Sequence, residues 1–181
     1  MRNFAQTADR IAATTKKLEK TALLAEYFKS APMDEAAIAA NFFSGRPFPM
    51  WEETTLQVGG TLLWRVVEEL SGKDDAELTA AYRKHGDLGA VAGSVLPNQQ
   101  ADEDACRPTV LEIEKVFRHI TAARGPAAKA DLVRELLSEV TPLEAKYIIK
   151  IMTGDLRIGL KESLVEEAIE RLMAPLSVAR F

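Results

Sequence analysis

Apolar side chains recur at helical spacing along nearly the whole chain, and this periodicity restricts the fold more than any other feature of the sequence. Near the N-terminus, Phe4, Ala8, Ile11 and Ala12 occupy positions i, i+4, i+7 and i+8, which form one stripe on a helix. Five later segments repeat such a stripe: residues 62–70, 113–120, 132–137, 145–152 and 164–172. No segment alternates apolar and polar residues as a half-buried strand would. The sequence therefore predicts an all-α protein.

Residues with strong capping preferences mark where several helices begin and end. In a capping box, the N-cap side chain accepts a hydrogen bond from the amide three residues later, and the Glu there bonds back to the N-cap amide. Three segments match this pattern: Asp74 with Glu77, Thr109 with Glu112, and Thr141 with Glu144. Gly45, Gly72 and Gly154 follow helical stretches, where a left-handed residue commonly ends a helix. These positions predict several of the helix boundaries.

One polar segment indicates how the chain is organised. Residues 97–108 are the most polar part of the sequence and predict a surface loop. This loop divides a compact multi-helix domain, residues 1–174, into two helical halves at about 1–97 and 108–174. We expect a glycine-bounded helix–hairpin–helix near the C-terminus of the domain, and residues 175–181 to begin a linker to further domains.

The composition is that of a soluble globular protein, with 181 residues of which 47% are hydrophobic and 28% charged. No run of about 18 apolar residues is present to span a membrane, and no signal-peptide core follows Met1. The lone Cys106 cannot form an internal disulfide, and no Cys/His cluster has metal-ligand spacing. His85 and His119 are isolated and belong to no catalytic set with telling spacing. We therefore expect a cytoplasmic protein without a membrane segment, and no metal site or catalytic residue in this chain.

The charge distribution leaves two interpretations open. The net charge of −4 argues mildly against nucleic acid as a partner, because duplex DNA is bound largely through neutralisation of its phosphates by Lys and Arg. Acidic residues gather at 74–77, 102–104 and 166–167. Basic residues recur elsewhere, at Lys16, Lys17, Lys20, Lys129, Arg157 and Lys161. A folded chain can therefore be acidic overall and still carry one basic face, although the sequence alone favours ordinary solvated helix surfaces.

A short segment with the sequence GDLRIG lies between the last two predicted helices. Its two glycines, Gly154 and Gly159, permit positive φ angles and the close approach of another backbone. The amides of Gly159, Leu160 and Lys161 would begin the last helix without intrahelical acceptors, so they are available to donate to a phosphate. Arg157 would add a charge-assisted contact, with Lys161 assisting. The segment is thus a candidate phosphate site.

The same segment has a simpler interpretation. Leu156, Ile158 and Leu160 are expected to turn inward and hold the segment in place, whether or not it binds a ligand. An ordinary tight turn between antiparallel helices, with Arg157 solvated, has the same spacing. The spacing alone favours this second interpretation.

Two further predicted helix starts carry lysines. Residues 14–17 (TTKK) place two hydroxyls and two ammonium groups at a helix N-terminus, with Thr14 and Thr15 as the expected caps. Residues 125–129 (GPAAK) place Lys129 near a third helix start. Considered alone, each segment is better explained as a plain cap followed by exposed lysines.

Five features of the chain occur together in a recognisable order: residues 12–20 (AATTKKLEK), 44–48 (SGRPF) and 85–89 (HGDLG), Lys129 in its helix start, and residues 154–160 (GDLRIGL). In this order they resemble the N-terminal region of ATP-dependent DNA ligases from eukaryotes, archaea and some bacteria. The resemblance covers almost the whole chain, and its last motif is the most specific. It implies an all-α domain that grips nicked duplex DNA through the minor groove and the sugar-phosphate backbone, helping the following domains to encircle it.

The resemblance also assigns residues to the DNA interface. Carried over residue by residue, these are Thr14, Thr15, Lys16, Lys129, Gly154, Arg157, Gly159 and Lys161. Arg157 and the two glycines match the family motif most closely. Such contacts to phosphate position a duplex without reading its bases.

The chain lacks the features that a complete ligase needs. Such enzymes are adenylated by ATP on the lysine of a Lys-x-Asp-Gly motif, and neither this motif nor a Gly-rich phosphate loop occurs here. The resemblance implies that ATP and Mg²⁺ serve the full-length ligase, whereas this chain alone binds no cofactor and is inactive. The implied partners are nicked double-stranded DNA and the ligase's own catalytic domains. We expect a monomer in the cytoplasm, associated with the nucleoid in a bacterium or archaeon.

A helical protein-interaction module is the alternative from another functional class. Residues 46–59 contain two prolines and two aromatic residues without sustained periodicity, which predicts an ordered connecting loop. The part of this loop from Phe48 to Trp51, or an exposed helix groove, is the candidate contact surface for a protein partner. The acidic net charge is the best support for this alternative.

Overall fold

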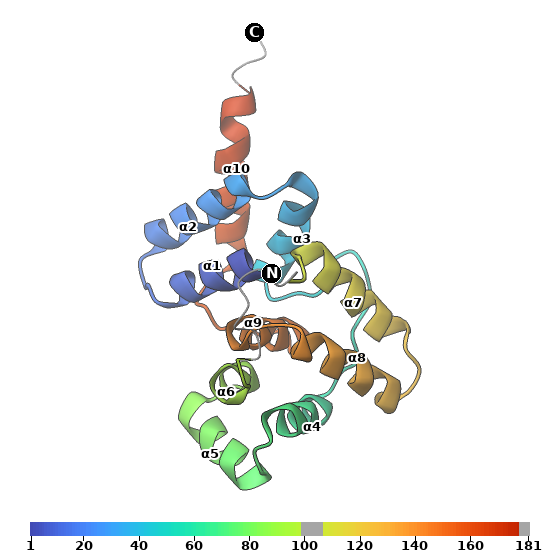
Figure 1. Cartoon of the computed structure of the whole chain (residues 1–181). Coiled ribbons are helices and arrows are strands. Elements are labelled where there is room, and N and C mark those ends of the chain that lie inside the picture. The colour runs from blue at the N-terminus through green and yellow to red at the C-terminus, as the bar shows by residue number, and fades with distance from the viewer. Residues whose placement is uncertain (99–106, 178–181) are drawn as a thin grey trace.

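The structure, a computed structural model, describes residues 1–98 and 107–177, with residues 171–177 described by their backbone alone. This part of the chain forms ten helices and no strand (Figure 1), which confirms the predicted all-α fold. In chain order the helices are α1 (Arg2–Ala12), α2 (Lys17–Ser30), α3 (Met33–Phe43), α4 (Gly60–Ser71), α5 (Asp75–His85), α6 (Leu88–Val95), α7 (Val110–Ala122), α8 (Pro126–Ser138), α9 (Pro142–Met152) and α10 (Glu162–Ser177). None of these helices is long and apolar enough to cross a membrane. Cys106 lies outside the described residues.

Several helix ends follow the predicted capping residues. Asp74, Thr109 and Thr141 each accept a hydrogen bond from the amide three residues later, and each forms a complete capping box with the Glu there. Gly72 and Gly86 end α4 and α5 in the left-handed conformation, with φ angles of 65° and 78°. These interactions are local in sequence, which is why the sequence predicts them.

Helices from both sides of the predicted surface loop pack against one another. α9 packs on α6 and α1, α8 on α4, α7 on α3, and α10 on α2 and α3. In Figure 1, α1, α2, α3 and α10 form an upper group, α4, α5 and α6 form a lower group, and α9 lies between them. Helices of the predicted halves 1–97 and 108–174 therefore pack against one another within one domain, and the boundary between the halves stays a prediction.

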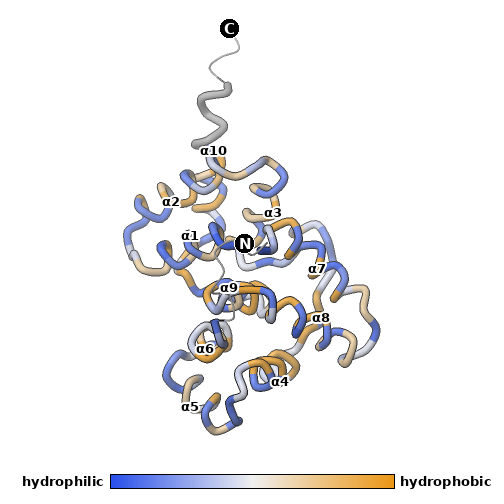
Figure 2. Tube along the Cα trace, in the orientation of Figure 1, coloured by the Kyte–Doolittle hydropathy of each residue, from blue (hydrophilic) through white to orange (hydrophobic). Residues whose placement is uncertain are grey.

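α9 is more fully buried than any other helix. Eight of its 11 residues are buried, and they include Glu144, Tyr147 and Lys150 besides the apolar residues. Figure 2 shows hydrophobic stretches along α9 in the middle of the molecule. Burying a polar or charged group costs free energy unless the group is hydrogen-bonded or paired. Tyr147 and Lys150 bond to carboxylates of other elements, whereas Glu144 bonds to Thr141 in the N-cap of its own helix.

The last helix continues beyond the predicted end of the domain. α10 extends to Ser177, so residues 175–177 are helical, and the expected start of a linker at residues 175–181 stays a prediction. Proline removes one backbone donor from a helix, but the strong helix formers Leu172, Met173 and Leu176 surround Pro175 in the sequence. Residues 178–181 lie outside the described part of the chain.

α6 approaches α9 closely because glycines face it. A Cβ atom added to Gly89 would lie 2.5 Å from the carbonyl oxygen of Lys146 and 2.6 Å from Cγ of Lys150. A Cβ atom at Gly93, one turn later, would lie 3.1 Å from Cβ of Lys146. Gly89 therefore serves helix packing, whereas Gly86 serves the turn before α6.

Gly89→Ala is expected to destabilise the domain by about 1–3 kcal/mol, the usual cost of overpacking a close contact. The alanine gains at most about 1 kcal/mol of helix propensity, which is too small to offset a clash with a backbone oxygen. Urea unfolding followed by circular dichroism measures the change. Gly60→Ala is the matched control, because no atom lies within 4 Å of the added methyl group in the first turn of α4. Equal stability of the two variants would contradict the close contact between α6 and α9.

Candidate nucleic-acid interface

The hairpin is the segment between α9 and α10, residues 153–161. Leu156 and Ile158 are buried, whereas the side chain of Arg157 between them is exposed, as the sequence predicts. Both glycines of the segment have positive φ angles, 73° and 62°. Arg157 itself has a φ of 49°, a left-handed conformation that few non-glycine residues adopt. The hairpin therefore has a defined backbone with one guanidinium group on its outer side.

The ammonium group of Lys20 in α2 fixes the hairpin from the inside. Its Nζ donates to the carbonyl oxygens of Ile158 at 2.6 Å and Gly159 at 2.9 Å. Gly159 has a positive φ, which favours glycine, and a Cβ atom there would lie 2.8 Å from this Nζ, so the end of the Lys20 side chain would have to shift. The sequence counts Lys20 among the basic surface residues, but the structure buries it. Its position at i, with Leu24 at i+4 and Tyr27 at i+7, places it on the apolar stripe of α2 and is the signal for this burial.

The segment after α3 contacts the other side of the hairpin. Gly45 has a φ of 76°, and a Cβ atom there would lie 3.5 Å from the carbonyl oxygen of Gly154. The guanidinium group of Arg46 donates from Nη1 to Oε1 of Glu162 at 2.7 Å and from Nη2 to Oε2 at 3.2 Å. This bidentate pair joins the segment after α3 to the first residue of α10.

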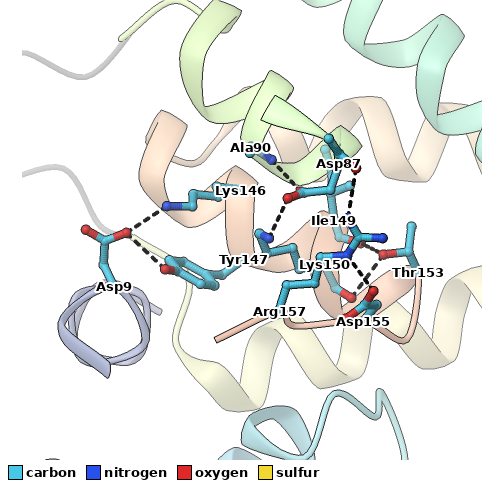
Figure 3. Close-up of polar contacts among 11 residues, drawn as sticks. Asp9, Asp87, Ala90, Lys146, Tyr147, Ile149, Lys150, Thr153, Asp155 and Arg157 are labelled. Atoms are coloured by element: carbon cyan, nitrogen blue, oxygen red, sulfur yellow. Dashed lines mark hydrogen bonds and ion pairs between the residues drawn. The ribbon is translucent and has the colours of Figure 1, made fainter. Parts of the chain in front are cut away.

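The turn between α5 and α6 contacts the outer part of the hairpin (Figure 3). Arg157 donates from Nε to Oδ2 of Asp155 at 2.6 Å and from Nη1 to the carbonyl oxygen of Gly86 at 2.8 Å. The bond to Asp155 raises the pKa of the guanidinium group, which is charged in any case. The predicted motifs at residues 85–89 and 154–160 thus meet in space.

Asp87, the residue after Gly86, forms a buried ion pair with Lys150 of α9. Oδ2 of Asp87 accepts a hydrogen bond from Nζ of Lys150 at 2.9 Å, and Oδ1 accepts from the amide of Ala90 at 2.7 Å (Figure 3). The Lys150 side chain is 6% exposed and that of Asp87 is 17% exposed. Burial by itself would raise the pKa of Asp87, but the bonds from Lys150 and Ala90 and the charges of Lys150 and Arg157 outweigh burial and lower it.

A second polar cluster joins α9 to α1. Oδ1 of Asp9 accepts from Nζ of Lys146 at 2.7 Å and from the hydroxyl of Tyr147 at 2.9 Å (Figure 3). Burial would raise the pKa of Asp9, but these two hydrogen bonds and the charge of Lys146 lower it. Burial and then the bond to Asp9 raise the pKa of Tyr147, so its hydroxyl remains a donor. The two clusters hold α9, and with it the start of the hairpin, against α1 and α6.

The start of α2 differs from the predicted threonine cap. The N-cap residue is Lys16, and no side chain caps the helix. The Thr14 hydroxyl instead accepts from the amide of Lys16 at 3.2 Å and donates to Oε2 of Glu19 at 2.7 Å. A threonine two residues before the cap forms its own local turn in this way. Thr15 and Lys16 are exposed, and Lys17 lies 3.2 Å from Glu167 of α10.

α10 begins at Glu162, three residues after Gly159, where the sequence predicts it to start. The amides of Gly159, Leu160 and Lys161 therefore lie in the turn before the helix. Among the described residues none of these three amides has a hydrogen-bond acceptor. They remain available as donors, and the side chain of Lys161 beside them is exposed.

Lys129 is the predicted DNA contact whose surroundings differ most from the expectation. Its side chain is buried, and Nζ donates to the carbonyl oxygen of Leu56 at 2.8 Å. It therefore holds the loop of residues 46–59 from inside the protein. As with Lys20, its stripe position with Val133 at i+4 and Leu136 at i+7 is the signal for this burial. A phosphate contact would require the ammonium group to leave this carbonyl, so the geometry favours a structural role for Lys129 over the predicted DNA contact.

Acidic partners accompany several basic side chains around the hairpin. The ion pairs are Arg46 with Glu162, Arg157 with Asp155, and Lys17 with Glu167. Lys16 and Lys161, by contrast, have no ion-pair partner in the described ranges. The side chains described there also bring no three His, Cys, Asp or Glu residues together as a metal site. The arrangement can donate several hydrogen bonds to an anion, through backbone amides, a guanidinium group and two ammonium groups.

Comparison with known proteins identifies relatives across almost the full chain. A family model described as DNA ligase N terminus matches residues 1–170. A probable DNA ligase of Koribacter versatilis is 52% identical over 94% of this chain and 29% of its own length. A probable DNA ligase of Opitutus terrae is 39% identical over 92% of this chain and 19% of its own length, and a DNA ligase of Methanopyrus kandleri is 30% identical over 92% and 31%. The chain thus spans about a third or less of the length of the curated relatives that it matches.

The buried ion pair predicts a stability loss that depends on charge and pH. Asp87→Asn keeps an oxygen that can accept from the amide of Ala90 but leaves the ammonium group of Lys150 unpaired, which is expected to cost about 3 kcal/mol near neutral pH. Because folding lowers the pKa of Asp87 from its ordinary value of 3.8, the stabilisation is complete above that value and is lost as the pH falls through the lowered pKa. Urea unfolding across this range should therefore show a smaller loss on acidification for Asp87→Asn than for the wild type. Parallel pH profiles would show that the pair contributes nothing.

Proposed function

The chain belongs to the DNA ligase N-terminus family, and on this basis, together with the geometry of the hairpin, we propose that it binds duplex DNA without sequence specificity. In this proposal the chain holds nicked DNA through the minor groove and the sugar-phosphate backbone. The hairpin at residues 153–161 and the start of α2 form the contact surface. The proposed contacts are Thr14, Thr15, Lys16, Gly154, Arg157, Gly159 and Lys161.

The observation that carries the proposal is the convergence of distant segments on the hairpin. Lys20 binds its carbonyl oxygens, Gly45 packs on its first glycine, and the carbonyl of Gly86 accepts from Arg157. Three regions far apart in the sequence thus fix the conformation of one exposed turn. An ordinary connection between two helices needs no such support, so the arrangement favours a binding role for the outer side of the turn.

The chemistry of that outer side suits phosphate. Arg157 offers a charged planar group, and the amides of Gly159, Leu160 and Lys161 offer uncharged donors close by in the chain. The ammonium groups of Lys16 and Lys161 add positive charge without a competing carboxylate among the described residues. Contacts of this kind follow the DNA backbone and do not distinguish bases, which supports binding without sequence preference.

The remaining length of the relatives supports a role for this chain as one part of a larger protein. We place the adenylated lysine, and the ATP and Mg²⁺ that serve it, in domains outside this chain. The chain alone then holds the duplex and does not seal a nick, and the seal in replication, repair or recombination requires the ligase's own catalytic domains. A monomer in the cytoplasm, associated with the nucleoid, fits this role.

A protein-interaction surface is the second candidate function. Trp51 and Met50 in the loop of residues 46–59 are 83% and 68% exposed. The same loop is held in place by Lys129 at Leu56 and by the bidentate pair of Arg118 with Glu52. A fixed loop with an exposed tryptophan is typical of a protein contact, since such residues are common at interfaces.

DNA binding should show the salt dependence of phosphate contacts. We expect the chain to bind nicked and intact duplexes of different sequence with similar affinity, and that affinity to fall steeply as salt rises. Arg157→Ala should weaken binding to all duplexes alike and flatten the salt slope by about 0.9 per lost phosphate contact. Fluorescence anisotropy with labelled duplexes at several salt concentrations measures both quantities.

Lys115→Ala provides the control for charge. Lys115 is exposed and belongs to α7, a helix on the side of the molecule opposite α2 in Figure 1, and its replacement removes the same charge as Arg157→Ala. Binding by this variant should remain close to that of the wild type. Absent or salt-independent binding by the folded wild-type chain would overturn the proposed function and favour the protein-interaction surface.

A further inference from the structure

Arg157 is held in one orientation before any ligand is present. Its backbone adopts the left-handed conformation, with a φ of 49°, so the side chain leaves the hairpin in a direction that an ordinary turn would not give. The guanidinium group then meets two acceptors, the carboxylate of Asp155 and the carbonyl oxygen of Gly86 (Figure 3). These acceptors come from different parts of the fold, since Gly86 lies in the turn between α5 and α6.

The two acceptors use only part of the hydrogen-bonding capacity of the guanidinium group. An arginine carries five N–H donors, one on Nε and two on each Nη nitrogen. Asp155 takes the donor on Nε, and Gly86 takes one donor on Nη1. Within the described residues 1–98 and 107–177, no acceptor takes the second donor of Nη1 or either donor of Nη2, and one donor on each nitrogen can bind two oxygens of a single phosphate.

We propose that Asp155 is a positioning residue that holds Arg157 ready for a phosphate and does not itself contact the DNA. This inference rests on the proposed function, because it assigns Arg157 to the DNA backbone. A mobile arginine side chain loses conformational entropy when it binds a phosphate, and a side chain whose guanidinium group is already fixed loses less. The carboxylate therefore favours binding in spite of its charge.

Simple electrostatics predicts the opposite effect of Asp155 on DNA affinity, so the direction in which affinity changes tests the inference. The carboxylate of Asp155 repels DNA phosphates, so removal of its charge alone should tighten binding. Loss of positioning should weaken it. The side chains of Asp155 and Arg157 are 54% and 51% exposed, so the pair contributes little to folding stability and its loss should leave the unfolding midpoint unchanged.

Asp155→Ala in the 181-residue chain is expected to weaken binding to a nicked duplex by about two- to tenfold, the range for ordering one long side chain. Asp155→Asn, whose amide oxygen can still accept from Nε, should bind at least as tightly as the wild type. Glu166→Ala removes one negative charge from an exposed position on α10 and should leave affinity unchanged or tighter. Anisotropy measured with labelled duplex, and urea unfolding of each variant, provide the data.

The salt slope and a double variant separate positioning from loss of structure. Arg157→Ala flattens the slope, whereas Asp155→Ala should keep the slope of the wild type because the phosphate contact still forms. In the Arg157→Ala background, Asp155→Ala should no longer weaken binding. Tighter binding by Asp155→Ala, or an equal loss in both backgrounds, would overturn the inference and leave the proposed function standing. Failure of the wild-type chain to bind any duplex would overturn both.

Discussion

The arrangement of this domain depends on how a buried lysine is neutralised. Lys150 lies on α9, which is enclosed by its neighbours, and an unpaired ammonium group there would cost several kcal/mol. Asp87 removes that cost, and its other oxygen caps α6. Because the same turn supplies the carbonyl of Gly86 to Arg157, one carboxylate connects the start of a helix, the packing of α6 on α9 and the orientation of the proposed DNA contact.

The sequence predicts those parts of the fold that local interactions determine. The capping boxes at Asp74, Thr109 and Thr141 lie where the sequence places them, since both partners are three residues apart. It does not predict how the helices pair, because α9 meets α6, and α10 meets α2, through contacts between residues far apart in the chain. The sequence also places a threonine cap at the start of α2 that the structure does not have, because a threonine near a helix start can equally form its own turn.

In the candidate site, too, the sequence predicts the local features but not the contacts between distant segments. The glycine conformations of the hairpin and the outward position of Arg157 follow from residues within the segment itself. The roles of Lys20 and Lys129 do not, because each ammonium group bonds a carbonyl of a distant segment. Both lysines nevertheless occupy the apolar stripe of their helix. A lysine at such a position is better interpreted as a buried donor than as part of a basic surface.

The bond from Lys20 to the carbonyl of Ile158 spans 138 positions in the chain. During synthesis, α2 leaves the ribosome long before the hairpin does. The ammonium group of Lys20 therefore stays hydrated until its carbonyl acceptors have been synthesised. The exposed turn can take its final shape only after α9 and the residues after it have emerged. This surface therefore cannot form until nearly all of the described chain has been synthesised.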